Sequence, residues 1–291
     1  FSYRWSQIFE MGRIPASETV LKARRVGEGP QAPFAPAPIH EVVARIASET
    51  PDLVFAPHVE TASGMILPDA YLRAVAEAVH AVGGLFVLDC IASGAAWVDM
   101  QATGVDVLIS APQKGWSSAS GCALVMLSAQ ARERIEHTAS SSFAADLRKW
   151  LQIMETYENG GHAYHATLPT EVVVRLSEAM DETRRFGFEA AREAQWNLGR
   201  RVRDLLARRG YPSVAAPGFE APGVVVAYTT DADIQSSRAF APLGLQTAAG
   251  VPLQCDEGAD FKTFRLGLFG LDKLMHIDRT VGHLDAALAR L

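Results

Sequence analysis

The first half of the chain alternates between short apolar runs and longer segments in which apolar residues recur at helical spacing. The runs that predict strands are residues 19–23, 53–56, 85–89, 105–110 and 122–127. Helical spacing is found in residues 40–48 and from about residue 68 to residue 82, where Pro68 suits a first helical turn. Strands that alternate with helices predict a mainly parallel sheet that is covered by helices on both faces.

The pattern changes after Pro169. Apolar residues at helical spacing predict two amphipathic helices there, with a break between them at Gly187. A small α+β unit is predicted to follow, with strands at residues 223–228 and 263–268, a helix near residues 234–240 and a closing helix over residues 274–291. We therefore predict a large α/β domain in residues 1–186 and a smaller C-terminal α+β domain in residues 187–291.

Composition and charge argue against some classes of binding partner. The chain has 27 basic and 33 acidic residues among 291 and a formal net charge of −6, which argues against nucleic acid or a membrane as the main partner. No apolar run reaches membrane-spanning length. The three cysteines have neither metal-site nor disulfide spacing, as expected for a cytoplasmic protein that binds no metal. No Gly-x-Gly-x-x-Gly follows an early strand, so a nicotinamide-binding fold has no support.

Two residues that can carry chemistry follow predicted strands. Asp89 ends one apolar run and Lys114 lies just after the next, with room for one crossover helix between them. In a parallel sheet both would lie at the carboxyl edge, where ligands bind. Alone, Asp89 could be a helix cap and Lys114 a solvated loop lysine. Together, with Gln113 adjoining, they favour a pyridoxal phosphate site, in which the lysine bonds to the cofactor aldehyde and the acid pairs with the pyridine nitrogen.

Three further segments add polar groups. Residues 58–64 (His-Val-Glu-Thr-Ala-Ser-Gly) are predicted to form a strand-to-helix turn whose hydroxyls can reach a phenolate or phosphate, although a plain turn is the simpler interpretation. Arg265 lies inside an apolar strand, where it either binds a substrate carboxylate or forms an internal salt bridge. Residues 160–169 are a polar and aromatic loop before a helix.

In this order, the motifs resemble those of class V aminotransferases of fold type I, close to the alanine–glyoxylate and serine–pyruvate group. The family has a His-x-Glu-[Ser/Thr]-x-[Ser/Thr]-Gly turn, an aspartate after an apolar strand, a Gly-[Ile/Val]-Asp segment, a Gln-Lys pair and an Arg-[Ile/Leu]-Gly strand. The matching segments are residues 58–64, 89–93, 104–106, 113–114 and 265–267. The resemblance covers essentially the whole chain and implies a pyridoxal 5′-phosphate enzyme.

The resemblance implies a role for each matching residue. Lys114 would be the catalytic residue that forms the Schiff base and moves the proton, and Arg265 would bind the substrate carboxylate. The residues that would contact the cofactor are Asp89 at the pyridinium, Thr61 at the phenolic oxygen, Ile91 under the ring, Gln113 near the phosphate and Phe1 stacked on the ring. Tyr164 and Thr167 would reach the phosphate of a partner subunit, which implies a homodimer with shared active sites.

Some features depart from the family pattern. The family has further residues before the position of Phe1, including a Ser/Gly-rich phosphate loop, so we expect the sequence to omit an N-terminal part. Residues 118–121 lack the proline that the family usually has before the glycine. Residues 248–262 are unlike the short glycine-rich loop of well-known members, which indicates that substrate choice differs.

The leading hypothesis is transamination between a small amino acid, of the alanine or serine type, and a 2-oxo acid such as glyoxylate or pyruvate. An alternative is a cysteine desulfurase or another lyase of the same fold, because Cys255 lies upstream of Arg265. Desulfurases usually have histidine before the lysine, however, and this chain has Gln113. A degenerate, non-catalytic relative is the third possibility, and the presence of Lys114, Asp89 and Arg265 together argues against it.

Overall fold

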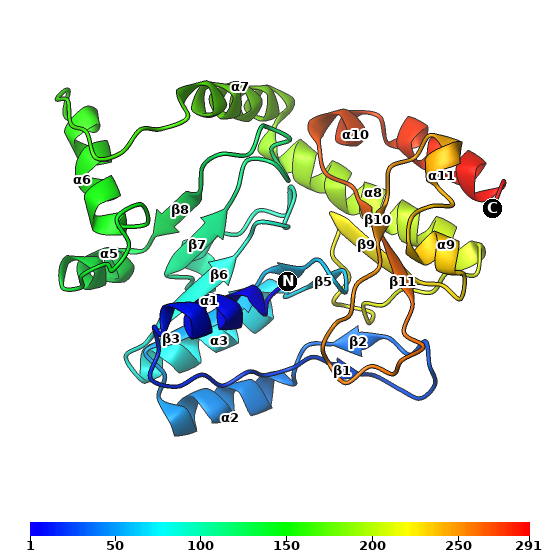
Figure 1. Ribbon diagram of the computed structural model, residues 1–291, viewed down its shortest axis with the longest axis horizontal. Coiled ribbons are helices and arrows are strands. Elements are labelled where there is room, and N and C mark those ends of the chain that lie inside the picture. Colours follow the sequence, from blue (N-terminus) through cyan, green and yellow to red (C-terminus); the bar gives the residue numbers. More distant parts are fainter.

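A computed structural model describes residues 1–291 and has a four-stranded sheet in the first half of the chain (Figure 1). Its strands, in spatial order, are β3 (Leu53–Pro57), β6 (Leu85–Asp89), β7 (Val107–Ser110) and β8 (Leu124–Leu127). The first three are parallel, whereas β8 pairs antiparallel with β7. The prediction of a mainly parallel sheet is confirmed, and β8 is its antiparallel edge.

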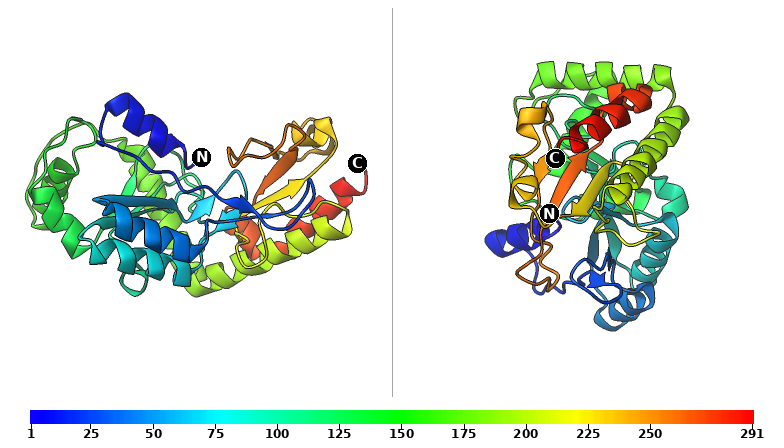
Figure 2. Two further views of the ribbon diagram at one scale, coloured as in Figure 1. Left: turned by 90° about the horizontal axis from the view of Figure 1, so that it is seen from below. Right: turned by 90° about the vertical axis from the view of Figure 1, so that its right-hand side faces the viewer.

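Helices lie on both faces of this sheet (Figure 2). On one face, α2 (Ile39–Glu49) and α3 (Asp69–Ala81) pack together over β6. On the other, α1 (Arg4–Gly12) places Trp5 and Phe9 against Phe55, with ring centroids 4.7 Å and 5.1 Å away. Because successive strand residues point to opposite faces, Val54 on the same strand packs with the α2–α3 side.

The second half begins with two long helices, α7 (Thr170–Phe186) and α8 (Phe188–Arg208). They are separated at Gly187, as the sequence predicts. Its φ of 101° is a backbone conformation that favours glycine, and it ends the first helix. A three-stranded antiparallel sheet follows, in the order β10 (Ala248–Ala249), β11 (Thr263–Gly267) and β9 (Val224–Tyr228). The remaining helices of this half are α9 (Ala232–Gln235), the 3₁₀ turn η1 (Ala241–Leu243), α10 (Leu271–Met275) and α11 (Ile277–Leu288).

Strand β9 joins the two halves because both of its faces are buried. Val225 and Ala227 pack with α8 and α11 in one core cluster. The alternate residues Val224, Val226 and Tyr228 pack against N-terminal segments in another. Those segments are β2 (Phe34–Ala35), which pairs with the exposed β1 (Arg24–Arg25), and the hairpin of β4 (Val59–Glu60) with β5 (Met65–Ile66). The division of the chain at residue 186 stays a prediction.

Most long elements match the sequence predictions to within a few residues. The prediction of a strand at residues 19–23 was wrong, because this segment is mostly exposed and only Arg24–Arg25 pairs, with β2. The elements that the sequence pattern did not predict are α1, α4 (Met100–Thr103), α5 (Ala129–Glu136), α6 (Leu147–Glu158) and the two-residue strands. None of the helices combines the length and apolarity that crossing a membrane requires.

Asp106 connects four elements at the end of the sheet opposite the strand carboxyl termini. Its buried carboxylate accepts the Phe86 backbone N–H at 2.8 Å and the Ser128 hydroxyl at 2.9 Å, and it contacts His80 Nε2 at 2.7 Å. Ser128 in turn caps the N-terminus of α5. The carboxylate therefore fixes the starts of β6 and β7 relative to α3 and α5.

We expect Asp106→Ala to lower the free energy of unfolding by about 2–5 kcal/mol, because it leaves buried donors without an acceptor. Urea denaturation followed by circular dichroism would measure the change. Asp99→Ala is the matched control, since Asp99 is exposed and only caps α4 through Ala102, and it should cost about 1 kcal/mol. Equal losses in the two variants would contradict the role assigned to Asp106.

Candidate active site

The carboxyl ends of the three parallel strands are aligned. Asp89, the last residue of β6, pairs with Pro57 on β3 and with Ile109 on β7. The His58 N–H donates to the Asp89 carbonyl at 2.8 Å, which extends the ladder by one bond. The turn that carries Lys114 begins directly after β7. The sheet therefore brings the segments of His58, Asp89 and Lys114 to one edge, as predicted.

Asp89 presents a carboxylate without a cationic partner. Its Oδ1 accepts the backbone N–H of Ile91 at 2.9 Å, and no lysine or arginine forms an ion pair with it. Burial raises the pKa of Asp89, and the nearby negative charge of Glu60 raises it further, against the Ile91 hydrogen bond. A bound cation at this position would relieve both effects.

The segment of residues 58–64 forms a hairpin turn between β4 and β5, and the prediction of a strand-to-helix turn was wrong. The turn residues Thr61 to Gly64 connect two strands, and α3 begins only after β5. Gly64 has a φ of 69°, and a Cβ there would lie 3.0 Å from the Val224 carbonyl oxygen of β9. Only glycine allows this approach, which fixes the half-buried Thr61 near the sheet edge.

His58 fastens this hairpin to the loop after Asp89. Its Nδ1 lies 2.7 Å from the Ser93 hydroxyl, and both side chains are buried. Burial lowers the pKa of His58 from its ordinary value of 6.5 to about 4, so the imidazole is neutral at neutral pH. We infer a structural role for His58.

Glu60 is a site residue to which the sequence analysis assigned no role. Its carboxylate accepts the backbone N–H of Ser2 at 2.8 Å and that of Ala62 at 2.9 Å, together with the Ser2 hydroxyl. The backbone nitrogen of Phe1 lies 2.9 Å from Oε1. The glutamate thereby holds the Phe1–Ser2 segment beside the hairpin turn; its place in the His-x-Glu motif was the available signal.

Arg265 lies on β11 with most of its hydrogen-bonding capacity free. Its Nε donates to the Ala249 carbonyl at 2.8 Å, and its Cζ lies 5.3 Å from the centroid of the Phe1 ring. No carboxylate forms an ion pair with it, so the internal salt bridge that the sequence left open is not formed. Burial lowers the pKa of Arg265, and the charge of Glu60 opposes the shift. The guanidinium can therefore accept an anionic ligand in bidentate geometry.

Lys114 lies in a tight turn that packs against the loop after Asp89. The Ser118 N–H donates to the Pro112 carbonyl at 3.1 Å, and a Cβ on Gly115 would lie 2.9 Å from the Gly94 carbonyl oxygen. The lysine is half-buried, and its Nζ lies 5.6 Å from the centroid of the Phe269 ring. Gln113 beside it is exposed.

Tyr164 and Thr167 are set apart from this group. Both are exposed on the connection between α6 and α7, and their hydroxyls lie 3.0 Å from each other. Neither forms a hydrogen bond with any predicted site residue outside this pair. Their predicted contact with a partner subunit stays a prediction.

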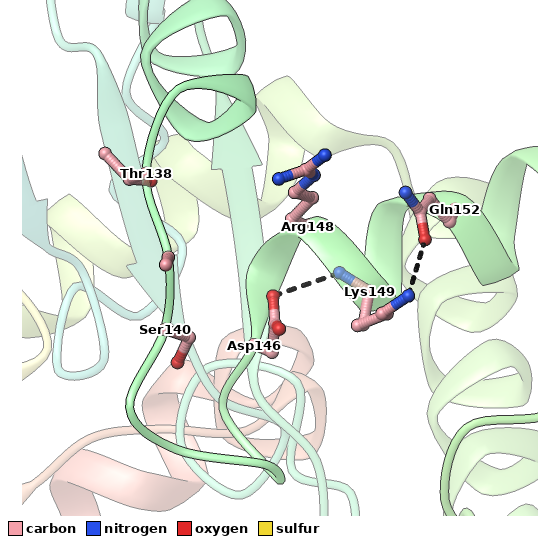
Figure 3. A pocket seen from close by; sticks show the side chains of 7 residues that line it. Thr138, Ser140, Asp146, Arg148, Lys149 and Gln152 are labelled. Carbon is pink, nitrogen blue, oxygen red and sulfur yellow. Dashed lines mark hydrogen bonds between the residues drawn. The ribbon is translucent and has the colours of Figure 1, made fainter.

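A separate pocket lies between the α5–α6 connection and the first turns of α6 (Figure 3). It has a volume of about 280 Å³ and a polar lining. The Asp146 carboxylate accepts the Lys149 N–H as a helix cap, and Lys149 Nζ donates to Gln152. The pocket shares no residue with the sheet edge, and we assign no chemistry to it.

Comparisons with known proteins identify the proteins that this chain resembles. The family model for class-V aminotransferases matches residues 37–233. Alanine–glyoxylate aminotransferase 1 of Saccharomyces cerevisiae is 25% identical over 196 residues, which are 65% of this chain and 47% of that protein. 2-Aminoethylphosphonate–pyruvate transaminase 2 of Paraburkholderia xenovorans is 28% identical over 241 residues, 80% of this chain and 61% of that protein.

Comparison with solved structures gives proteins of the same kind. The crystal structure of an alanine–glyoxylate aminotransferase from Nostoc sp. superimposes with a TM-score of 0.72 at 19% identity, covering 86% of this chain and 65% of that one. This likeness confirms the predicted fold class. The chain spans about half to three fifths of the length of these two curated relatives.

The buried His58 predicts a pH dependence of stability. Its pKa is about 4 in the folded chain and near 6.5 when unfolded, so the unfolded state binds the proton more tightly. Its contribution is complete above pH 6.5 and falls as the pH drops towards 4, by about 1.4 kcal/mol per unit at most. Chemical denaturation across this range should show a steeper pH dependence in the wild type than in His58→Asn.

Ser93→Ala is the matched control for this measurement. It removes the hydrogen bond but keeps the buried imidazole, so the steep pH dependence should persist. Identical pH dependence in wild type and His58→Asn would contradict the assignment.

Proposed function

The chain belongs to the class-V aminotransferase family, and we propose that it transfers an amino group between a small amino acid and a 2-oxo acid with pyridoxal 5′-phosphate as cofactor. The observation that carries the proposal is a pair of charges that have no ion-pair partner and that both interact with the charge of Glu60. Asp89 is an acid without a cation, and Arg265 is a guanidinium without an anion. A pyridinium and a substrate carboxylate are the groups that would complete them.

The residues at the sheet edge fit the cofactor. Asp89 would hold the pyridinium nitrogen through its free Oδ2, while Ile91 N–H keeps Oδ1 in place. The residues that we propose to contact the rest of the cofactor are Thr61, Gln113, Ile91 and Phe1, with Tyr164 and Thr167 contributed by a partner subunit. When bound, the cofactor supplies an electron sink that weakens the bonds at the substrate α-carbon.

The chain's own residues do the positioning and the proton transfer. Arg265 would bind the substrate carboxylate with its two Nη groups, since Nε is already bonded to the Ala249 carbonyl. Lys114 Nζ would remove the proton from the substrate α-carbon as a general base and deliver it, as a general acid, to the former aldehyde carbon of the cofactor. Glu60 would keep Phe1 beside Arg265 through its hydrogen bonds to the Phe1–Ser2 segment. Its own negative charge acts on the nearby Asp89.

The assembly and substrates are part of the same proposal. We propose alanine- or serine-type donors, acceptors such as glyoxylate or pyruvate, and a cytoplasmic homodimer with shared sites. The names of the relatives, which include alanine–glyoxylate and aminoethylphosphonate–pyruvate enzymes, support the oxo-acid acceptors. Tyr164 and Thr167 are exposed on the connection between α6 and α7, where a partner subunit could contact them.

The structure gives no support to the desulfurase alternative. Cys255 is half-buried, and its Sγ lies 3.6 Å from the Leu253 carbonyl oxygen, to which it donates. Burial raises the pKa of the Cys255 thiol, and the nearby Glu257 carboxylate raises it further. Both effects oppose the thiolate that sulfur transfer requires.

We expect Lys114→Ala to abolish covalent attachment of the cofactor. Borohydride reduction of the wild type in the presence of pyridoxal phosphate should leave an adduct on Lys114 that peptide mass spectrometry locates. L-Alanine or L-serine should change the cofactor absorbance of the wild type but not of the variant. Lys149→Ala, on exposed α6, is the control. An adduct that survives in Lys114→Ala would overturn the assignment.

Arg265→Lys tests the carboxylate site. Loss of bidentate geometry should raise the KM for the amino acid by about 10- to 100-fold while cofactor affinity changes little. Arg201→Lys is the control, because Arg201 only pairs with Asp278 on the surface. Measuring both L-alanine and 2-aminoethylphosphonate would identify the donor class, and an unchanged KM for every donor would contradict the role of Arg265.

A further inference from the structure

Phe269 touches Lys114 from the segment that also carries Arg265. It lies four residues after Arg265, just beyond the end of β11. The distance from Lys114 Nζ to its ring centroid, 5.6 Å, is within the range of a cation–π interaction. Only two other such pairs occur in the chain, and neither contains a lysine. No role was assigned to Phe269 from the sequence.

The backbone on both sides of this ring is held in place. The buried Gln195 side chain of α8 donates from Nε2 to the Leu268 carbonyl at 3.2 Å and to the Pro222 carbonyl at 3.1 Å. Lys273 Nζ donates to the Phe269 carbonyl at 2.9 Å. The Leu268 N–H donates to the Gly223 carbonyl at 2.9 Å. The backbone that carries the Phe269 ring is therefore held in one position.

Gly223 makes room for the ring, whereas Gly94 and Gly267 lie within ordinary contact distance of it. A Cβ at Gly223 would lie 3.1 Å from the ring, and Cβ atoms at Gly94 and Gly267 would lie 3.5 Å from it. Gly94 belongs to the loop after Asp89, and its carbonyl also meets Gly115 of the lysine turn. The ring is thus enclosed by the same loops that position Lys114.

We propose that Phe269 is a positioning residue for Lys114, which holds the ε-amino group against its ring face and ties the lysine to the segment of Arg265. This rests on the proposed role of Lys114 as the reactive lysine. The negative face of the ring attracts the ammonium form more than the neutral amine. The contact therefore limits where the ε-amino group can move, and how readily it meets a reagent, until the cofactor is bound.

The test measures the reactivity of Lys114 in the cofactor-free full chain, without turnover. Trace acetic anhydride at pH 7.5 acylates only neutral amines, and peptide mass spectrometry reports the rate at each lysine, with exposed Lys149 as the internal reference. Removal of the ring in Phe269→Met should speed acylation of Lys114 by about two- to fivefold. Phe269→Leu should give a similar increase, and Phe269→Tyr, which keeps the ring, should return the rate to that of the wild type.

Phe261→Leu is the matched control. Phe261 is also half-buried, but it packs edge-on against Phe34 and Tyr228 and touches no cation. Three outcomes would overturn the proposal: equal rates in wild type and Phe269→Met, the same increase in Phe261→Leu, or an increase in Phe269→Leu alone, which would show only greater access to solvent. Because no turnover is measured, failure of transamination would leave this result unchanged.

Discussion

The alignment of three parallel strand ends is the constraint on which the rest of the site depends. The pairing of Pro57, Asp89 and Ile109 sets where each following loop leaves the sheet. A slip of one residue in β6 would turn the Asp89 side chain to the opposite face. Asp106 secures the register from the other end by bonding the starts of β6 and β7 to the neighbouring helices. The hydrogen bonds of Asp106 at the start of β6 thus help to set the position of the Asp89 carboxylate at the end of that strand.

The charged side chains at this edge do not pair with one another. Asp89 and Glu60 are both partly buried and interact, and Arg265 feels the charge of Glu60 without pairing with it. Glu60 is satisfied by backbone N–H groups, which leaves Arg265 free for an incoming anion. An internal Glu60–Arg265 ion pair is the simpler arrangement for these residues, and it would have occupied the guanidinium. His58 contributes no charge, because burial keeps it neutral.

The sequence could predict the parts of this arrangement that depend on local pattern. Apolar runs located β3, β6 and β7, and the residues after them gave Asp89 and Lys114. It could not give the direction of β8, because hydrophobicity carries no information about strand direction. Residues 19–23 have strand-like side chains but no partner for their backbone, which local propensity does not reveal. The His-x-Glu motif pointed to Glu60 but not to its partners Phe1 and Ser2, which lie far from it in the chain. The contact of Phe269 with Lys114 likewise joins distant residues, so local pattern does not predict it.

The candidate residues lie on two sheets, which the buried strand β9 connects. The hairpin that carries Thr61 rests on β9 at Gly64, where Arg203 Nη2 donates to the carbonyls of Ala221 at 2.6 Å and Val224 at 3.1 Å. Arg265 lies on β11, which pairs with β9 along its full length. Any shift of the second sheet therefore moves the guanidinium, the hairpin and the Phe269 ring together. Lys114 is attached to the first sheet and meets that ring across the boundary, so the contact between them reports the relative position of the two halves.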